Sequence, residues 1–377
     1  MSRKKSKKYK IGIDARMYGY AQTGIGNYIR HLLKYIFELD KENSYVIFLS
    51  PEEYDSFRLP NERIKKVKVS AKWYGYKEQL LFPFQLYKEN LDLMHFTHFN
   101  SPVLYFKKSI VTIHDITPLH FPGHKMKSII RRIGFKIVFF SSVKKAARVI
   151  AVSKNTKSDI VKHFKIKENK IKVVYEGVDE QFGIVGNRHA CSLQCQITKP
   201  FIFYTGVWRN HKNLVGLIRA FGVLKNKYKL NYQLVLGGKE DPYYPEVRKT
   251  WKELNLEKDI IRAGFIDQKD LPLFYNAAEI FVIPSFYEGF GLIGLEAMAC
   301  GTPVVSSNKT SLPEVLGDAA IYFNPNNPEE MAEKMKLVLT DEKLYNELRE
   351  KGFQQIKKYS WEKMGKETME IYRKILQ

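Results

Sequence analysis

Cysteines, acidic side chains and long apolar runs are scarce in this chain of 377 residues, and each scarcity excludes a class of protein. Three cysteines cannot build a disulfide framework, so we expect a reducing compartment, the cytoplasm. No run of 18 or more apolar residues occurs, so we expect no helix that spans a membrane. The basic N-terminus leads into a predicted strand without an apolar core, so we expect no signal peptide.

Acidic residues are outnumbered, because 40 Asp and Glu face 62 Lys and Arg and leave a net charge of +22. Residues 1–180 carry a net charge of +18 and the remainder only +4, so the basic surface belongs to the first half. The excess indicates an acidic partner, for which an anionic membrane and a nucleic acid are the two candidates. The sequence contains no Asp-x-Asp, the carboxylate pair that marks a metal-bound diphosphate site.

The strongest signal is the stretch over 283–305, which reads IPSFYEGFGLIGLEAMACGTPVV. Apolar residues over 279–283 predict a buried parallel strand. Gly289 and Gly291 then allow the backbone to approach a ligand, and the apolar spacing predicts a helix over 292–299. The N-terminus of such a helix offers unpaired N–H groups and a positive dipole to an anion.

Two glutamates lie eight positions apart in this stretch, Glu288 before the predicted helix and Glu296 inside it. This spacing suits two separate hydroxyl-bearing parts of one extended ligand better than an acid–base pair. The glutamates and their glycines resemble the Glu-x7-Glu signature of the retaining GT-B glycosyltransferases, family 4. The resemblance implies that Glu288 contacts the donor sugar and that Glu296 binds the ribose hydroxyls. Ile293 stands where the family usually has a proline, a departure at a packing position.

A second strand, turn and helix pattern begins with a predicted strand over 201–205. Arg209 and Lys212 come before or at the helix N-terminus, where two cations and a helix dipole suit a diphosphate. The Lys-Asn pair is similar to the family's phosphate-binding lysine, which implies this role for Lys212. The usual positions of the family's arginine hold His211 and Val207 here, so the resemblance supports the role of Arg209 less directly.

The first half contributes a glycine loop and a histidine. Gly24 and Gly26 follow the first predicted strand, over 9–14, and indicate a site where phosphates approach the backbone. His114 and Asp115 end a buried strand, at the edge where open α/β sheets bind ligands. The His-Asp motif is similar to one in family 4, and this resemblance implies that His114 lines the cleft between donor and acceptor. Asp115 is placed to orient the imidazole through a hydrogen bond.

The histidines and cysteines elsewhere do not form a complete metal site. His95 and His98 have the spacing of a metal pair, but no third ligand follows at a fitting distance. His189, Cys191 and Cys195 form an equally incomplete set, so we expect no bound metal.

The resemblance covers nearly the whole chain and implies the α/β GT-B fold, two Rossmann-like domains that face each other across a cleft. We expect an acceptor domain over 1–182 with a closing helix over 361–377, a linker over 183–199, and a nucleotide-sugar domain over 200–360. The residues implied in catalysis are His114, Glu288, Lys212 and Arg209. Those implied in donor binding are Gly24, Gly26, Gly206, Gly238, Phe290, Gly291, Leu292 and Glu296, with the nucleotide base around Gly264 and Phe265.

The implied reaction moves a hexose from a GDP- or UDP-linked sugar to a glycan or lipid-linked acceptor in polysaccharide assembly, with retention and without a cofactor. Likeness to mannosyltransferases favours GDP-mannose. Positive charge from Lys212, Arg209 and the helix end takes the place of a metal at the leaving diphosphate. A double displacement needs two carboxylates at the anomeric carbon, and Glu288 is the only plausible one. We therefore prefer a same-face attack assisted by the departing phosphate.

Two surfaces of the first half leave alternatives open. The helical pattern over 124–149 is cationic and apolar, which suits peripheral binding to anionic lipid on the inner face of the membrane or an ordinary crossover helix. The aromatic segment over 72–90 suits a surface that faces the membrane or the acceptor, or a packed loop and helix. A sugar-nucleotide epimerase or phosphorylase is the nearer alternative function. A nucleic-acid-binding protein would explain the charge but not the Glu-x7-Glu stretch.

Overall fold

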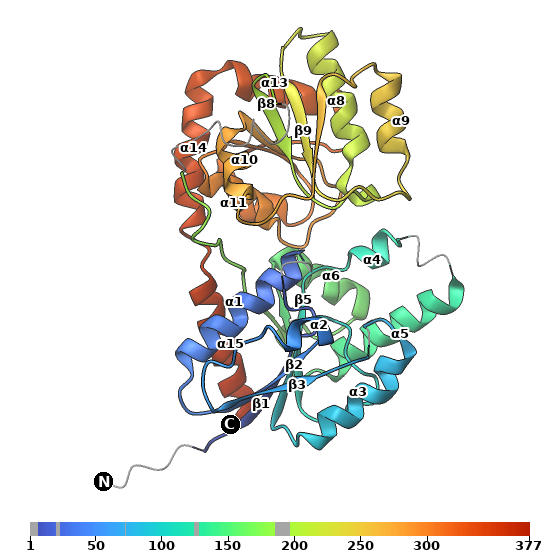
Figure 1. Ribbon diagram of the computed structural model, residues 1–377, viewed down its shortest axis with the longest axis vertical. Coiled ribbons are helices and arrows are strands. Elements are labelled where there is room, and N and C mark those ends of the chain that lie inside the picture. Colours follow the sequence, from blue (N-terminus) through green and yellow to red (C-terminus); the bar gives the residue numbers. More distant parts are fainter. Residues whose placement is uncertain (1–6, 20–22, 72, 124–127, 185–196) are drawn as a thin grey trace. The chain divides into compact units, whose positions relative to one another are not determined.

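The protein folds into two compact units in the computed structural model, which describes residues 7–19, 23–71, 73–123, 128–184 and 197–377. The first unit consists of Met1–Ile116, Pro122–Gly177 and Trp361–Gln377, and the second of Thr117–Phe121 and Val178–Ser360. Each unit contains one parallel sheet with helices on both sides (Figure 1).

The first unit has a seven-stranded parallel sheet in the order β3-β2-β1-β4-β5-β6-β7. Its strands are β1 (Lys10–Asp14), β2 (Ser44–Leu49), β3 (Ile64–Lys68), β4 (Leu93–Phe96), β5 (Ser109–Ile113), β6 (Arg148–Ala151) and β7 (Ile171–Val173). Its helices are α1 (Thr23–Leu39), α2 (Pro51–Tyr54), α3 (Tyr76–Lys88), α5 (Ile129–Lys145), α6 (Lys154–Phe164) and α15 (Trp361–Leu376). Strands β4 and β5 are buried at every position, as expected where helices cover both faces of a parallel sheet.

The second unit has a six-stranded parallel sheet in the order β10-β9-β8-β11-β12-β13. Its strands are β8 (Phe201–Tyr204), β9 (Gln233–Gly237), β10 (Ile260–Gly264), β11 (Ile280–Ile283), β12 (Val304–Ser307) and β13 (Ala320–Phe323). Its helices are α4 (Thr117–His120), α8 (Leu214–Asn226), α9 (Glu246–Glu253), α10 (Leu271–Ala277), α11 (Leu292–Ala299), α12 (Leu312–Leu316), α13 (Pro328–Thr340) and α14 (Glu342–Ile356). The short apolar runs of β8 and β11 form central, fully buried strands, as their composition predicts.

Helix α15 belongs to the first unit, where it packs along α1 (Figure 1). Gly365 lets the two helices approach closely, because a Cβ atom at this position would lie 2.6 Å from the Cβ of Tyr35. The rings of His31 and Trp361 stack with their centroids 4.5 Å apart. The amphipathic sequence of α15 thus buries one face against the first unit, although 183 residues of the second unit, Val178–Ser360, separate it from that unit in the chain.

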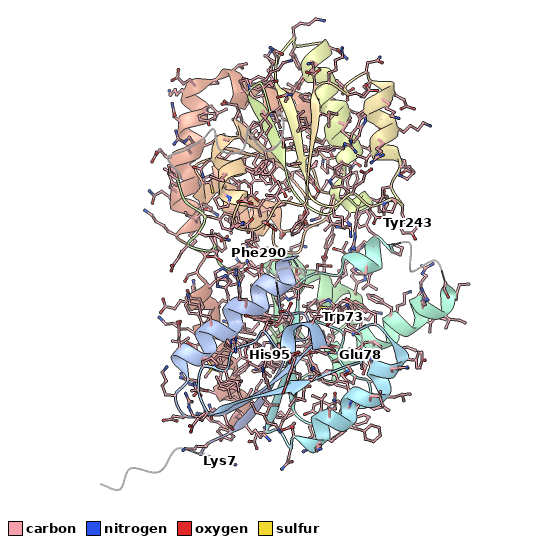
Figure 2. All side chains as sticks on the ribbon, in the orientation of Figure 1. Lys7, Trp73, Glu78, His95, Tyr243 and Phe290 are labelled. Atoms are coloured by element: carbon pink, nitrogen blue, oxygen red, sulfur yellow. The ribbon has the colours of Figure 1, made fainter. Side chains whose placement is uncertain are left out.

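His95 is a core residue, although its spacing from His98 suggested a metal pair. Its Nδ1 lies 2.6 Å from the hydroxyl of Tyr372, and its Nε2 lies 2.8 Å from the hydroxyl of Thr112. Burial and the nearby His114 lower the pKa of His95 to about 3, so the ring stays neutral at pH 7. Figure 2 shows His95 inside the first unit, where it contributes no exposed surface.

No group of three or more His, Cys, Asp or Glu side chains within the described ranges could hold a metal ion. His189, Cys191 and Cys195 lie outside the described residues. None of the helices in the described ranges combines the length and apolar character that crossing a bilayer requires.

Two predictions of local structure were wrong. Gly24 and Gly26 do not form a loop, because α1 already begins at Thr23 and both glycines lie in its first turns. The cationic helix predicted over 124–149 is shorter: α5 ends at Lys145, and Ala146 leaves helical geometry with φ −53° and ψ 135°. The chain enters β6 at Arg148, since the apolar residues that follow are needed in the sheet. Residues 124–127 lie outside the described residues.

Replacing Gly365 with alanine should lower the thermal midpoint of the first unit. The added methyl group would collide with Tyr35, and overpacking a buried contact costs about 1–3 kcal/mol. Gly134→Ala is the matched control, because it is also in a helix and a Cβ atom there meets nothing within 4 Å. The control should be neutral or stabilising by up to about 1 kcal/mol. Equal midpoints for the two variants in calorimetry would contradict the close packing of α1 and α15.

Candidate active site

The candidate site lies at the carboxyl edge of the second sheet, at the point where the strand order reverses. Strand β8 has β9 on one side and β11 on the other, so the loops after β8 and β11 leave this edge in opposite directions. Ligands of open α/β sheets bind at such a switch point. The loop after β8 carries Lys212, and the loop after β11 carries Glu288.

Lys212 and Glu288 form an ion pair across the switch point. The Nζ of Lys212 lies 2.7 Å from Oε1 and 2.9 Å from Oε2 of Glu288. Their side chains are only 17% and 12% exposed, so the pair is largely screened from water. Ser285 donates a hydrogen bond of 2.6 Å to the same carboxylate. The backbone N–H of Glu288 donates to the Thr310 hydroxyl at 3.0 Å, which fixes the loop.

The ion pair sets the charge state of the site at neutral pH. Burial alone would raise the pKa of Glu288, but the charge of Lys212, with hydrogen bonds from Lys212 and Ser285, lowers it below its ordinary value. Glu288 is therefore a carboxylate at pH 7. Burial and the charge of Lys212 lower the pKa of the neighbouring His211 to about 4, so its ring is neutral. The site thus presents one ammonium and one carboxylate to a ligand.

Asn213 connects the two loops. It has left-handed geometry, with φ 54°, at the N-terminus of α8, and its side chain accepts a hydrogen bond from the N–H of Gly216. Its amide nitrogen donates to the carbonyls of Pro284, at 3.0 Å, and Pro325, at 2.8 Å. The residue therefore caps one helix and holds the ends of two other segments. Arg209 lies exposed three residues before Lys212, at the start of the short turn that ends there.

Glycines let the backbone segments of this edge approach one another. Gly238 has φ 101°, and a Cβ atom there would lie 1.9 Å from the carbonyl oxygen of Gly206, so no larger residue fits. Gly291, with φ 98°, caps α11, and a Cβ atom there would lie 2.8 Å from Leu312. A hollow opens beside Gly238 at the ends of β8, β9 and β10, lined by Trp208, Gly238, Lys239, Glu240, Arg262, Gly264 and Phe265.

Glu296 lies within α11 and is 5% exposed. One of its carboxylate oxygens accepts a hydrogen bond of 3.1 Å from the hydroxyl of Tyr275. Burial and the nearby carboxylate of Glu296 raise the pKa of the Cys300 thiol to about 12, so the thiol remains protonated. Phe290 lies on the loop that leads into α11 (Figure 2) and packs its ring edge-on against Tyr359, at 5.6 Å between centroids. Leu292 is the first residue of α11.

Ser311 is a residue that the sequence analysis missed. Its hydroxyl lies 3.0 Å from the carbonyl oxygens of both Glu288 and Phe290, and these contacts hold the loop that contains Gly289 and Gly291. Ser285 and Thr310 were also missed. A single hydroxyl has no spacing signature in a sequence, and these hydroxyls reach the loop around Glu288 only in the folded chain. The polar run over 306–311, which begins with the last two residues of β12 and continues into the loop after it, was the one available signal.

His114 lies at the carboxyl end of β5 in the first unit. Its Nε2 is 3.0 Å from the carbonyl oxygen of Thr97, so this nitrogen carries a proton and donates. Its Nδ1 lies 3.1 Å from a carboxylate oxygen of Glu176, where the sequence suggested Asp115. The ring of Tyr28 meets the imidazole edge-on at 4.7 Å. The structure thus fixes the ring on both sides, through residues distant in the sequence.

Two family models match the chain in its two halves. The model of glycosyl transferases group 1 matches residues 192–355, and the model of glycosyltransferase family 4 matches residues 23–182. The O-antigen chain mannosyltransferase B of Escherichia coli is 31% identical over 71% of this chain and 70% of its own length. The O-antigen chain mannosyltransferase RfbU of Salmonella typhimurium is 29% identical over 68% of this chain and 67% of its own length. The serotype-specific mannosyltransferase WbdA of Escherichia coli is longer, and only 34% of it is matched, at 29% identity over 72% of this chain.

Solved structures share the fold over nearly the whole chain. Sucrose-phosphate synthase from Thermosynechococcus elongatus has a TM-score of 0.79 at 20% identity and covers 98% of this chain and 99% of its own. HepE of Anabaena, in complex with UDP and glucose, has a TM-score of 0.75 at 16% identity and covers 97% of this chain and 100% of its own. The GT-B fold and the prediction of a glycosyltransferase are confirmed, and none of these proteins supports an epimerase, a phosphorylase or a nucleic-acid-binding protein. The chain belongs to family 4, group 1, of the glycosyltransferases.

Proposed function

We propose that the protein transfers a hexose, with mannose as the first candidate, from a nucleoside diphosphate sugar to a hydroxyl of a glycan or lipid-linked acceptor in cell-surface polysaccharide assembly. The observation that carries the proposal is the Lys212–Glu288 ion pair at the switch point, at the same carboxyl edge of the sheet as Gly206 and Gly238. The names of the O-antigen mannosyltransferases support mannose, and hence GDP-mannose as donor. The UDP complex of a structural neighbour keeps a UDP-sugar as the alternative.

The second unit binds the donor in this proposal. The ammonium of Lys212 carries three N–H groups and stabilises the diphosphate as negative charge develops on it. Glu288 is ionised and accepts hydrogen bonds from the sugar hydroxyls. The hollow lined by Trp208, Gly264 and Phe265 receives the nucleotide base, and Glu296 accepts hydrogen bonds from the ribose. Arg209, exposed before Lys212, adds positive charge for the diphosphate.

The first unit binds the acceptor, and the transfer proceeds with retention. The bond between the anomeric carbon and the phosphate oxygen breaks, and the acceptor oxygen bonds to the same face of that carbon. The proton of the acceptor hydroxyl passes to the departing phosphate oxygen. This course is favoured because Glu288 is committed to Lys212 and Glu296 is buried against Tyr275, so neither is placed as a free nucleophile. His114, fixed by Thr97 and Glu176, lines the acceptor side.

A donor screen tests the proposal directly. The purified protein should hydrolyse or transfer from GDP-mannose faster than from UDP-linked sugars, with turnover measured as released nucleoside diphosphate. Excess EDTA should leave the turnover unchanged, because Lys212 and Arg209 carry the positive charge at the diphosphate. The anomeric configuration of the product, determined by NMR, should match that of the donor. Loss of turnover in EDTA with recovery on added Mg²⁺ or Mn²⁺, or an inverted product, would contradict the proposal.

Replacing Lys212 with methionine should lower both turnover and stability. Turnover should fall about 100-fold or more, because a fixed charge at the leaving group is lost. Breaking a buried ion pair costs about 3–5 kcal/mol, and the partial exposure of this pair reduces that figure. The double variant Lys212→Met/Glu288→Gln removes the unpaired carboxylate, so its thermal midpoint should recover while turnover stays low. A double variant with wild-type turnover would exclude both side chains from the reaction.

Glu296→Gln should weaken nucleoside diphosphate binding about tenfold or more, since hydrogen bonds to a charged group contribute about 1.5–3 kcal/mol. Calorimetry with GDP and its 2′-deoxy form separates a ribose contact from a packing effect. The wild-type protein should bind the deoxy form more weakly, and Glu296→Gln should bind both forms alike. Tyr275→Phe is the control, because it removes the buried partner of Glu296 and leaves the carboxylate in place. A variant that still distinguishes the two nucleotides would place the ribose elsewhere.

A further inference from the structure

Helix α3 has an apolar stripe on each of two opposite faces. Phe82 and Leu86 are buried in the first unit, as expected of a helix that covers a sheet. Tyr76, Leu80 and Phe84 follow at intervals of four residues on another face, and their side chains are 75%, 55% and 74% exposed. Helices that are apolar all round are normally buried in a core or a membrane, so the outer stripe calls for an explanation.

Helix α5 repeats the pattern with added positive charge. Its inner face buries Phe139 and Val143, whereas Ile129, Ile130 and Ile133 are exposed, Ile130 by 82%. Its 17 residues include five cations and no carboxylate: Arg131, Arg132, Lys136, Lys144 and Lys145. An exposed isoleucine cluster among cations has a cost in water and combines the two properties that bind an interfacial helix to anionic lipid.

The segment over 103–106 joins the two helices into one surface. Tyr87 of α3 donates a hydrogen bond of 3.1 Å to the carbonyl of Leu104 and accepts one of 3.0 Å from the N–H of Phe106. Lys145 of α5 lies over the ring of Phe106, with its Nζ 4.0 Å from the centroid, and donates to the carbonyl of Val103. Leu104 and Phe106 are themselves exposed, by 51% and 70%.

This surface gathers most of the exposed large apolar side chains of the protein. Eighteen are exposed among the described residues, and twelve of them belong to α3, the segment over 103–106 and α5. Figure 1 shows the two helices on the same side of the first unit. Helix α3 follows β3 of the parallel sheet, so it begins on the side of the carboxyl edge, where Trp73, three residues before α3, lines a small hollow with His98. The surface therefore reaches the edge at which the acceptor is proposed to bind.

We propose that α3, the segment over 103–106 and α5 form a membrane-docking surface that inserts apolar side chains into an anionic lipid layer and brings a lipid-linked acceptor to the edge of the first sheet. The inference rests on the proposed function for the acceptor and deepens it. Anionic lipid is the occupant because its acyl chains complement the exposed apolar side chains and its headgroups complement the cations of α5. A second copy of the chain would oppose cations to cations, and a nucleic acid would leave the isoleucines and Phe84 in water.

Tryptophan reporters test insertion with the full chain. Phe84→Trp and Ile130→Trp place an indole on each helix, and Leu337→Trp places one on an exposed apolar position of the second unit. With vesicles of phosphatidylglycerol and phosphatidylcholine that carry brominated acyl chains, the first two variants should be quenched more strongly than the wild-type protein. Leu337→Trp should be quenched no more than the wild type. Equal quenching of all three variants would overturn the proposal.

An apolar triple variant, Ile129→Asn, Ile130→Asn and Ile133→Asn, separates insertion from attraction by charge. Its affinity for the anionic vesicles should fall roughly tenfold or more, because apolar area no longer leaves water. The wild-type protein should keep part of its binding at high salt, which screens charges but does not weaken apolar burial, and the variant should lose that part. The affinity of this variant for nucleoside diphosphate should equal that of the wild-type protein, which serves as the control for correct folding. Unchanged vesicle binding by this variant would overturn the proposal.

A charge variant tests the choice of lipid. Reversing Arg131, Arg132 and Lys136 to glutamate should abolish the preference for phosphatidylglycerol over phosphatidylcholine. The same reversal at Lys229, Lys343 and Lys357, exposed on the second unit, changes the net charge equally and should leave the preference intact. A wild-type protein that binds nucleoside diphosphate but ignores anionic vesicles would overturn the docking surface alone. Vesicle binding by a protein that transfers no sugar would support the surface and contradict the proposed function.

Discussion

The ion pair between Lys212 and Glu288 is the interaction on which the donor side depends. Two loops that leave the sheet edge in opposite directions meet at one ammonium and one carboxylate, 2.7 Å apart. Each charge would be costly to bury alone, and each is acceptable because the other is present. The pair therefore keeps Glu288 ionised and positions both loops before any ligand arrives. Asn213, Ser285 and Thr310 add neutral hydrogen bonds that hold the same geometry.

The first unit places a comparable arrangement at its own switch point, between β1 and β4. Arg16 pairs with Asp14 and Glu78, and Asn100 donates two hydrogen bonds of 2.7 Å to Glu78. Figure 2 shows Glu78 inside the unit, where its side chain is fully buried. The difference between the two clusters is informative. The Arg16 cluster satisfies its charges within one edge of the first sheet, where Asp14, Arg16 and Asn100 also line the small hollow, whereas the Lys212 pair joins two loops of the second unit.

The sequence predicted what depends on local patterns and missed what depends on contacts between distant residues. Apolar runs located β8 and β11, and the glycines around Glu288 located the loop at the switch point. The partner of His114 could not be found in this way, because Glu176 lies 62 positions away. The pairing of Lys212 with Glu288, 76 positions apart, was likewise invisible, although each residue was singled out by its own motif. At Gly24 and Gly26 the glycine signal favoured a loop, yet the apolar face of α1 extends the helix through both.

The return of α15 to the first unit sets an order for synthesis on the ribosome. Residues 7–116 of the first unit emerge early, but the face of α1 that packs against Trp361 and Gly365 has no partner until α15 has been made. The second unit, by contrast, is contiguous from Val178 to Ser360 apart from the short α4 segment, and its core is complete before α15 leaves the exit tunnel. Domains fold as units when their chains become available. The half of the enzyme that is translated first is therefore completed last.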